Sequence, residues 1–177
     1  MTTSRNDFDA VAMYDAMDRQ RIERGLSWRQ VLDQIWELSA DLNERRNSHP
    51  ISPSTITGIA KRGDTTCQHA LFFLRWLGRT PESFLSKPPA DPAYGALPAA
   101  GPDKRLRWNL QALYDALNRR RMEEQLTWRE LAAQIRCSEH QLTGIRTARY
   151  AIAMSLAMRI VGWLERPAAA FVYPAEW

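Results

Sequence analysis

Apolar residues recur at the spacing of an amphipathic helix along most of the chain. In the segment 7–24 they include Phe8, Val11, Ala12, Tyr14, Ala16 and Met17, and in 106–124 they include Trp108, Ala112, Leu113 and Leu117. No segment alternates polar and apolar residues over the length of a strand. The pattern therefore predicts an all-α fold without a sheet.

Two stretches of the chain carry nearly the same residues. Positions 14–35 match positions 114–135 at eleven of 22 sites, with a constant offset of 100. Numbered in the first copy, the shared residues are Tyr14, Asp15, Ala16, Arg19, Arg21, Glu23, Leu26, Trp28, Arg29, Gln34 and Ile35. Further on, Thr57-Gly58-Ile59 returns as Thr143-Gly144-Ile145 at an offset of 86. The chain therefore holds two copies of one unit, and the first copy carries 14 additional residues in its middle. Two units are too few for a solenoid and predict a tandem pair of small domains.

Capping signals divide each copy into five helices. Ser27 is followed three places later by Gln30, and Thr127 in the same way by Glu130, which is the pattern of a capping box. Ser138 and Gln141 repeat the pattern, and Ser52 precedes a proline that suits a first helical position. The first helices cover 7–24 and 106–124, and the second helices begin at Trp28 and Trp128. The third begin at Pro53 and Glu139, the fourth cover about 67–77 and 155–164, and short fifth helices follow Pro81 and Pro167.

The additional residues of the first copy lie between Ile35 and Ser52. Val31, Ile35, Leu38 and Leu42 keep helical spacing, which predicts that the second helix continues to near Arg45. Between the copies, five of the ten prolines fall within 86–103, which predicts an extended, semi-rigid linker spanning up to roughly 55 Å. The expected organisation is a first domain over 1–86, a linker over 87–103 and a basic second domain over 104–177.

The charge of the chain is concentrated in its second copy. The whole chain has a net charge of +4, but residues 104–177 hold 12 Lys and Arg against 7 Asp and Glu. Residues 1–86 hold 11 of each kind. This asymmetry favours a polyanion surface on the second copy, with a solvated basic face as the alternative.

Signals for other kinds of chemistry are missing from the sequence. The three histidines are scattered, and the sequence shows no paired catalytic acids, phosphate-binding glycine loop or nucleophile elbow. Cys67 and Cys137 are not spaced as metal ligands and are interpreted as reduced packing residues. No uncharged apolar run is long enough for a membrane helix. We expect a protein that is not an enzyme, binds no cofactor or metal, and does not contact a membrane.

Residues 126–145 resemble the helix-turn-helix of the XRE family, the phage Cro and lambda-repressor type. The matching positions are Leu126, Thr127, Leu131, Ala132, Ser138, Leu142 and Ile145. The resemblance covers about 70 residues of the second copy and extends to the first by internal homology. It implies two tandem five-helix domains of the lambda-repressor-like type.

In that family the N-terminal residues of the third helix face base edges in the major groove. The resemblance places at bases Glu139, His140, Gln141 and Thr143 in the second copy, and Ser54, Thr55 and Thr57 in the first. It places at phosphates Trp128, Arg129, Arg146 and Arg149, and in the first copy Trp28, Arg29, Lys61 and Arg62.

The sequence departs from the family pattern at two kinds of position. Trp28 and Trp128 stand where the family has Gln, and the alternative to a phosphate contact is packing on Tyr14 and Tyr114. Arg136 stands at the turn position usually held by Gly, which implies a left-handed backbone there.

The sequence thus predicts a bacterial transcriptional regulator that binds specific double-stranded DNA in the cytoplasm, at the nucleoid. The first copy either reads a second half-site or serves for homodimerisation or for binding a protein partner. The alternative for the whole chain is an adaptor or antitoxin-like protein that keeps the fold without binding DNA.

Overall fold

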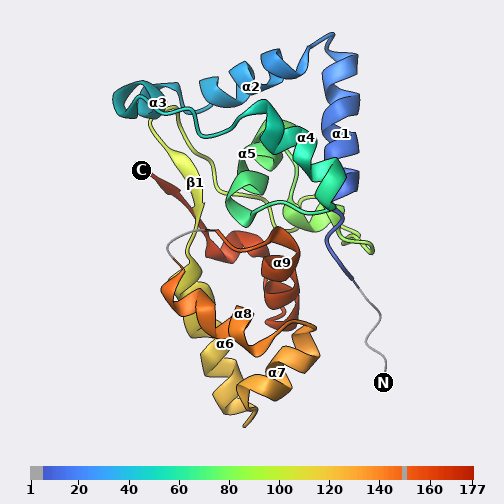
Figure 1. Cartoon of the computed structure of the whole chain (residues 1–177), viewed down its shortest axis with the longest axis vertical. Helices are drawn as coiled ribbons and strands as arrows, with labels where there is room; N and C mark the ends of the chain where they lie inside the picture. The colour runs from blue at the N-terminus through green and yellow to red at the C-terminus, as the bar shows by residue number, and fades with distance from the viewer. Residues whose placement is uncertain (1–5, 149–150) are drawn as a thin grey trace.

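The computed structural model describes residues 6–148 and 151–177, and Figure 1 shows the arrangement of their helices and strands. In the first repeat (residues 6–86) the elements are α1 (Ala10–Glu23), α2 (Trp28–Glu37), α3 (Ala40–Arg46), α4 (Pro53–Arg62), α5 (Cys67–Leu77) and the 3-10 helix η1 (Pro81–Phe84). In the second repeat (104–177) they are β1 (Arg105–Trp108), α6 (Leu110–Glu123), α7 (Trp128–Ile135), α8 (Glu139–Thr143), η2 (Gly144–Thr147), α9 (Met154–Trp163), η3 (Ala168–Phe171) and β2 (Val172–Ala175). The mostly helical architecture is confirmed.

The predicted capping boxes form at the starts of α2, α7 and α8. At α7 the amide of Glu130 donates to Thr127 Oγ1 at 3.2 Å, and a Glu130 carboxylate oxygen accepts from the Thr127 amide at 2.8 Å. Ser138 and Gln141 make the same pair of bonds at α8, at 3.1 and 2.9 Å. Because each box involves residues three positions apart, local sequence alone is enough to place these helix starts.

The expectation of no sheet is wrong. β1 and β2 pair antiparallel, with Arg105 opposite Ala175 and Trp108 opposite Val172. Residues 106–108, expected in the first helix of the second repeat, belong to this strand, and α6 begins only after its N-cap Asn109. The first repeat contains a trace of the same pairing, an isolated bridge between Phe8 and Leu85. Four-residue strands are too short for a period-two signal, and their pairing joins the two ends of a repeat.

The expected continuation of the second helix to near Arg45 is also wrong. α2 ends at Glu37, the chain turns at Leu38 and Ser39, and α3 is a separate helix. The turn is held by tertiary bonds, because Arg75 donates to the Leu38 carbonyl at 2.6 Å and Ser39 Oγ donates to the Lys104 carbonyl at 2.7 Å. Apolar spacing persists through the turn, so periodicity alone did not reveal it.

The segment 87–103 is not an extended linker. It contains turns closed by bonds such as Tyr94 N–H to the Asp91 carbonyl at 3.1 Å, and Leu97 and Ala100 pack against the core. Arg75 donates to the Ala100 carbonyl at 2.7 Å, which fastens the end of the segment to α5. Prolines prevent regular structure here, but they leave the chain free to fold back onto the first repeat.

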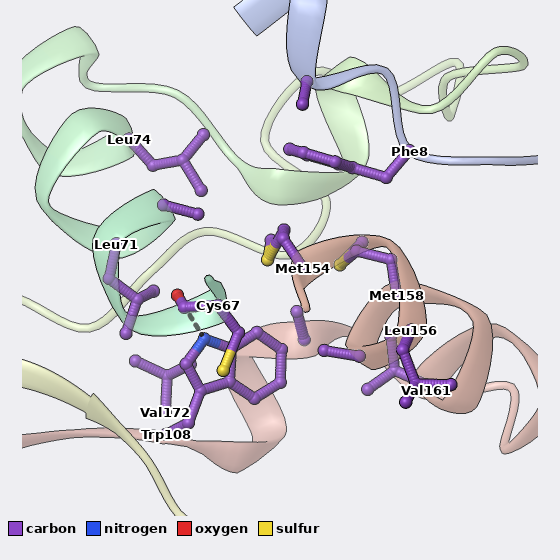
Figure 2. Packing of buried hydrophobic residues seen from close by; sticks show 14 of the residues in the cluster. Phe8, Cys67, Leu71, Leu74, Trp108, Met154, Leu156, Met158, Val161 and Val172 are labelled. Atoms are coloured by element: carbon purple, nitrogen blue, oxygen red, sulfur yellow. Dashed lines mark hydrogen bonds between the residues drawn. The ribbon is translucent and has the colours of Figure 1, made fainter. Parts of the chain in front are cut away.

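Buried side chains of both repeats belong to one hydrophobic cluster. Figure 2 shows Leu71 and Leu74 of α5 facing the same space as Met154 and Met158 of α9. The Trp108 indole N–H donates to the Cys67 carbonyl at 3.0 Å across this boundary. The two-domain organisation stays a prediction, but the repeats are in intimate contact.

The contact between the repeats has local two-fold symmetry. Thr66 and Ala153, the N-caps of the equivalent helices α5 and α9, form an antiparallel bridge. The Cys67 amide donates to the Ile152 carbonyl at 2.7 Å, and the Met154 amide donates to the Thr65 carbonyl at 2.8 Å. Equivalent backbone groups thus make reciprocal bonds, as in an isologous dimer interface.

In the described residues no helix is long and apolar enough to cross a membrane.

Candidate nucleic-acid interface

The consecutive helices α7 and α8 pack against each other across a short turn in the second repeat. The buried side chains of Leu131 and Ile135 from α7 and Leu142 from α8 hold the two helices together. Arg136 ends α7 with φ of 63°, so the left-handed backbone expected at this turn is confirmed. The Arg136 side chain forms an ion pair with Asp7 of the first repeat, and its hydrogen bond to Asp7 raises the pKa of Arg136.

The predicted base-facing residues of the second repeat lie together on α8. Glu139, His140 and Gln141 are exposed, and Thr143 is half-buried. Gln141 already accepts the Ser138 amide, and the Thr143 hydroxyl donates to the Glu139 carbonyl at 3.2 Å. The imidazole of His140 is exposed and makes no hydrogen bond or ion pair among the described residues.

The corresponding residues of the first repeat lie on α4 and bond mostly to their own turn. The Ser54 hydroxyl lies 2.8 Å from that of Ser52, Thr55 Oγ1 accepts the Ser52 amide at 3.4 Å, and the Thr57 hydroxyl donates to the Pro53 carbonyl at 3.3 Å. Thr57 and Ser54 are exposed and Thr55 is half-buried. The first repeat therefore presents short hydroxyls with local partners rather than long polar side chains.

The predicted phosphate ligands are exposed cations around these helices. Arg29 and Arg129 lie in the first turns of α2 and α7, Arg146 lies on η2, and Lys61 and Arg62 end α4, all of them exposed. The Arg62 guanidinium folds back over Gly58, where an added Cβ would come within 2.4 Å of it. It also lies near His69, whose pKa is lowered by burial and by this positive charge. Arg149 lies outside the described residues.

Trp28 and Trp128 are stacked between two side chains of their own repeats. Trp28 stacks on Tyr14 with ring centroids 5.5 Å apart, and Trp128 stacks on Tyr114 at 5.6 Å. On these same rings lie Arg21, 4.9 Å from the Trp28 centroid, and Arg121, 4.5 Å from the Trp128 centroid. This is the packing alternative to the predicted phosphate contact, and it explains why Tyr, Arg and Trp recur together in both repeats.

A hydrogen bond between a tryptophan and a glutamine recurs in both repeats and joins helices near the candidate site. The Trp76 indole donates to Gln34 at 2.9 Å, and in the second repeat the Trp163 indole donates to Gln134 at 2.9 Å. Gln134 lies on α7, which directly precedes α8, and Gln34 lies on the equivalent helix α2. The recurrence of Gln34 and Gln134 could have indicated that both accept an equivalent hydrogen bond. Contacts found in one repeat alone leave no such recurrence in the sequence.

The candidate base-facing residues of each repeat lie on short helices that follow a capped helix carrying an exposed arginine. Among residues 6–148 and 151–177 there is no group of three or more His, Cys, Asp or Glu side chains placed to hold a metal ion. Comparisons with protein families, with curated proteins and with solved structures find no match to this chain.

Proposed function

We propose that the chain is a transcriptional regulator that binds specific double-stranded DNA with both repeats on one duplex, as a covalent pseudo-dimer. The observation that most supports this proposal is the reciprocal pair of bonds at Cys67 and Met154, which gives the contact between the starts of the equivalent helices α5 and α9 a local two-fold symmetry. DNA half-sites are themselves related by a two-fold axis, so a rigid two-fold pair of recognition helices suits them. The closely packed segment 87–103 favours this rigid arrangement over two freely moving readers.

The two repeats have different tasks in this proposal. α8 carries the exposed His140 and lies in the repeat with the excess of positive charge, so it supplies most of the base discrimination. α4 supplies short hydroxyls and the cations Lys61 and Arg62, so it contributes positioning more than sequence selection.

The test is selection of duplexes from a random pool by the full chain, followed by affinity measurements over a salt series. We expect an asymmetric two-part motif and a steep loss of affinity with salt. His140→Ala is expected to relax the preference in one half of the motif, and Arg129→Gln to weaken all sequences and lower the salt slope by about one. Arg19→Gln, at an exposed position of α1, is the matched control. Absence of binding at low salt overturns the proposal.

A second candidate is a protein-binding adaptor, favoured by a cavity of about 560 Å³ in the first repeat. Its lining includes Trp36, His49 and Pro50, and the Trp36 and His49 rings are stacked with centroids 6.4 Å apart. The loop after α3, which belongs to the insertion, forms one wall. Retention of a protein partner in high salt, together with absence of DNA binding, is the result that selects this candidate.

A further inference from the structure

Three arginines from two separate elements lie near one another beside the small sheet. Arg46 ends α3 in the inserted segment of the first repeat, and Arg105 and Arg107 belong to β1 of the second repeat. We call these residues the sheet arginines. Arg46 owes its position to the separate helix α3, and Arg105 and Arg107 owe theirs to the strand β1. Apolar periodicity predicted neither element.

Backbone geometry places the three side chains together. Arg105 and Arg107 are two positions apart on a strand and lie on one face of the sheet, opposite Leu106 and Trp108, and of the two Arg105 is buried and Arg107 half-buried. Arg105 donates to Asn43 Oδ1 of α3 at 2.5 and 3.2 Å. Arg46 follows Asn43 by three helical positions and so extends from the same side of α3.

The cluster carries concentrated positive charge. Burial lowers the pKa of Arg105, and the charges of Arg107 and Arg46 lower it further. Burial also lowers the pKa of Arg107; Tyr173 opposes this effect and the charge of Arg46 adds to it. In the described part of the chain none of the ion pairs joins an Asp or Glu side chain to these three residues. Guanidinium groups stay charged under these conditions, so the repulsion favours an anion from outside.

The cluster continues toward the proposed DNA-binding face. Arg107 and Trp177 line one cavity together with Ala148, which directly follows η2 and its exposed Arg146. The Arg107 guanidinium lies 4.6 Å from the centroid of the Trp177 ring, and its Nε donates to the Trp177 backbone oxygen at 2.8 Å. This stacking holds the Arg107 side chain against the C-terminal end of the second repeat, whereas Arg46 is exposed on the first repeat.

We propose that Arg46 and Arg107 bind the phosphodiester backbone of the same duplex, next to the segment read by α8, while the buried Arg105 joins α3 to the strand that carries Arg107. The inference rests on the proposed function and adds to it a contact that no helix-turn-helix residue makes. Guanidinium groups suit this task because their paired N–H donors match phosphate oxygens. The inserted helix α3 thereby acquires a role, since it brings Arg46 to a surface otherwise formed by the second repeat.

The experiment measures affinity for the selected duplex over a salt series with the full chain carrying Arg46→Gln and Arg107→Gln. We expect weaker binding, an unchanged sequence preference, and a salt slope reduced by about two, because two phosphate contacts are lost. Arg107→Lys keeps the charge and is expected to recover about one unit of that slope. Arg46→Gln alone, at an exposed position, is expected to remove about one unit without disturbing the fold.

Control variants separate failure of this inference from failure of the proposed function. Arg19→Gln removes an exposed charge from α1 and is expected to leave the slope unchanged, and His140→Ala is expected to alter sequence preference with little change in slope. If the double variant keeps the salt slope of the unaltered chain while His140→Ala still relaxes the sequence preference, the arginine contact with phosphate is overturned and the proposed DNA binding stands. Absence of DNA binding by the unaltered chain overturns both.

Discussion

Asp64 of the first repeat caps a helix of the second: its carboxylate accepts from the hydroxyl of Ser155 and, at 3.3 Å, from the Ser155 amide in the first turn of α9. α9 has no side-chain cap of its own, because its N-cap residue is Ala153. The residue equivalent to Asp64 in the second repeat is Ala151, so the cap is made in one direction only. A carboxylate at a helix N-terminus satisfies free amides and favours the helix dipole.

Asp64→Ala is expected to lower the free energy of unfolding by about 0.5–2 kcal/mol, the usual range for loss of an N-cap. Urea denaturation measures the loss. A double-mutant cycle with Ser155→Ala isolates the contact, and a coupling energy near zero contradicts the cap. Asp33→Ala, at an exposed position of α2, is the matched control.

The two Trp–Gln pairs provide an internal comparison. Trp76 is 7% exposed, so Gln34→Ala leaves a buried indole N–H without a partner and is expected to cost about 1–3 kcal/mol. Gln134→Ala leaves the N–H of the more exposed Trp163 to water and is expected to cost less. Unfolding free energies of the two variants test this order, and an equal or larger effect at Gln134 contradicts the burial argument.

Arg75 is expected to control the order of the segment 87–103. The Arg75 guanidinium donates to the Leu38 carbonyl and to Ser39 Oγ in the turn after α2, the latter at 2.8 Å. It also donates to the Ala100 carbonyl in the segment 87–103. Burial lowers the pKa of Arg75. Arg75→Lys cannot keep all of these bonds, because a single ammonium replaces the planar group.

We expect that variant to increase amide hydrogen exchange and proteolytic cleavage in 96–101. Arg45→Lys, at an exposed site of α3, is the control that leaves both rates unchanged. Equal protection of 96–101 in both variants would show that Arg75 does not fasten the segment.

Glu82 makes stability depend on pH. Its carboxyl group is 4% exposed, Oε1 accepts the Ala168 amide at 2.6 Å, and Oε2 is buried without a hydrogen-bond partner in the described structure. Burial raises the pKa of Glu82. Its contribution to stability is therefore complete below about pH 4.3, the ordinary value in an unfolded chain, and is lost as pH rises through the folded pKa.

Glu82→Gln removes this loss, so the difference in unfolding free energy between the variant and the unaltered chain is expected to shift in favour of the variant as pH rises above about 4.3. Urea denaturation at several pH values measures the difference. Glu165→Gln, at an exposed position, is expected to follow the unaltered chain. Parallel curves for Glu82→Gln would exclude an elevated pKa.

Local interactions account for what was predictable from the residues alone. Helix starts depend on partners three positions away, as at Thr127 and Glu130, and the helical faces follow from apolar spacing. The duplication was visible because Tyr14, Arg21 and Trp28 stack within each repeat and therefore recur as a set. Gln34 recurs in the same way, because its equivalent Gln134 makes the same hydrogen bond to a tryptophan.

Contacts between distant segments account for the features of the fold that could not be predicted from the residues alone. The sequence by itself determined the helices, their caps, the duplication and the excess charge of the second repeat, because each depends on near neighbours or on composition. Only the tertiary structure decided the pairing of β1 with β2, the break after α2, the folded course of 87–103 and the two-fold contact at Cys67 and Met154. These features arise from single hydrogen bonds and packed side chains joining far-apart positions, which leave no periodic trace along the chain.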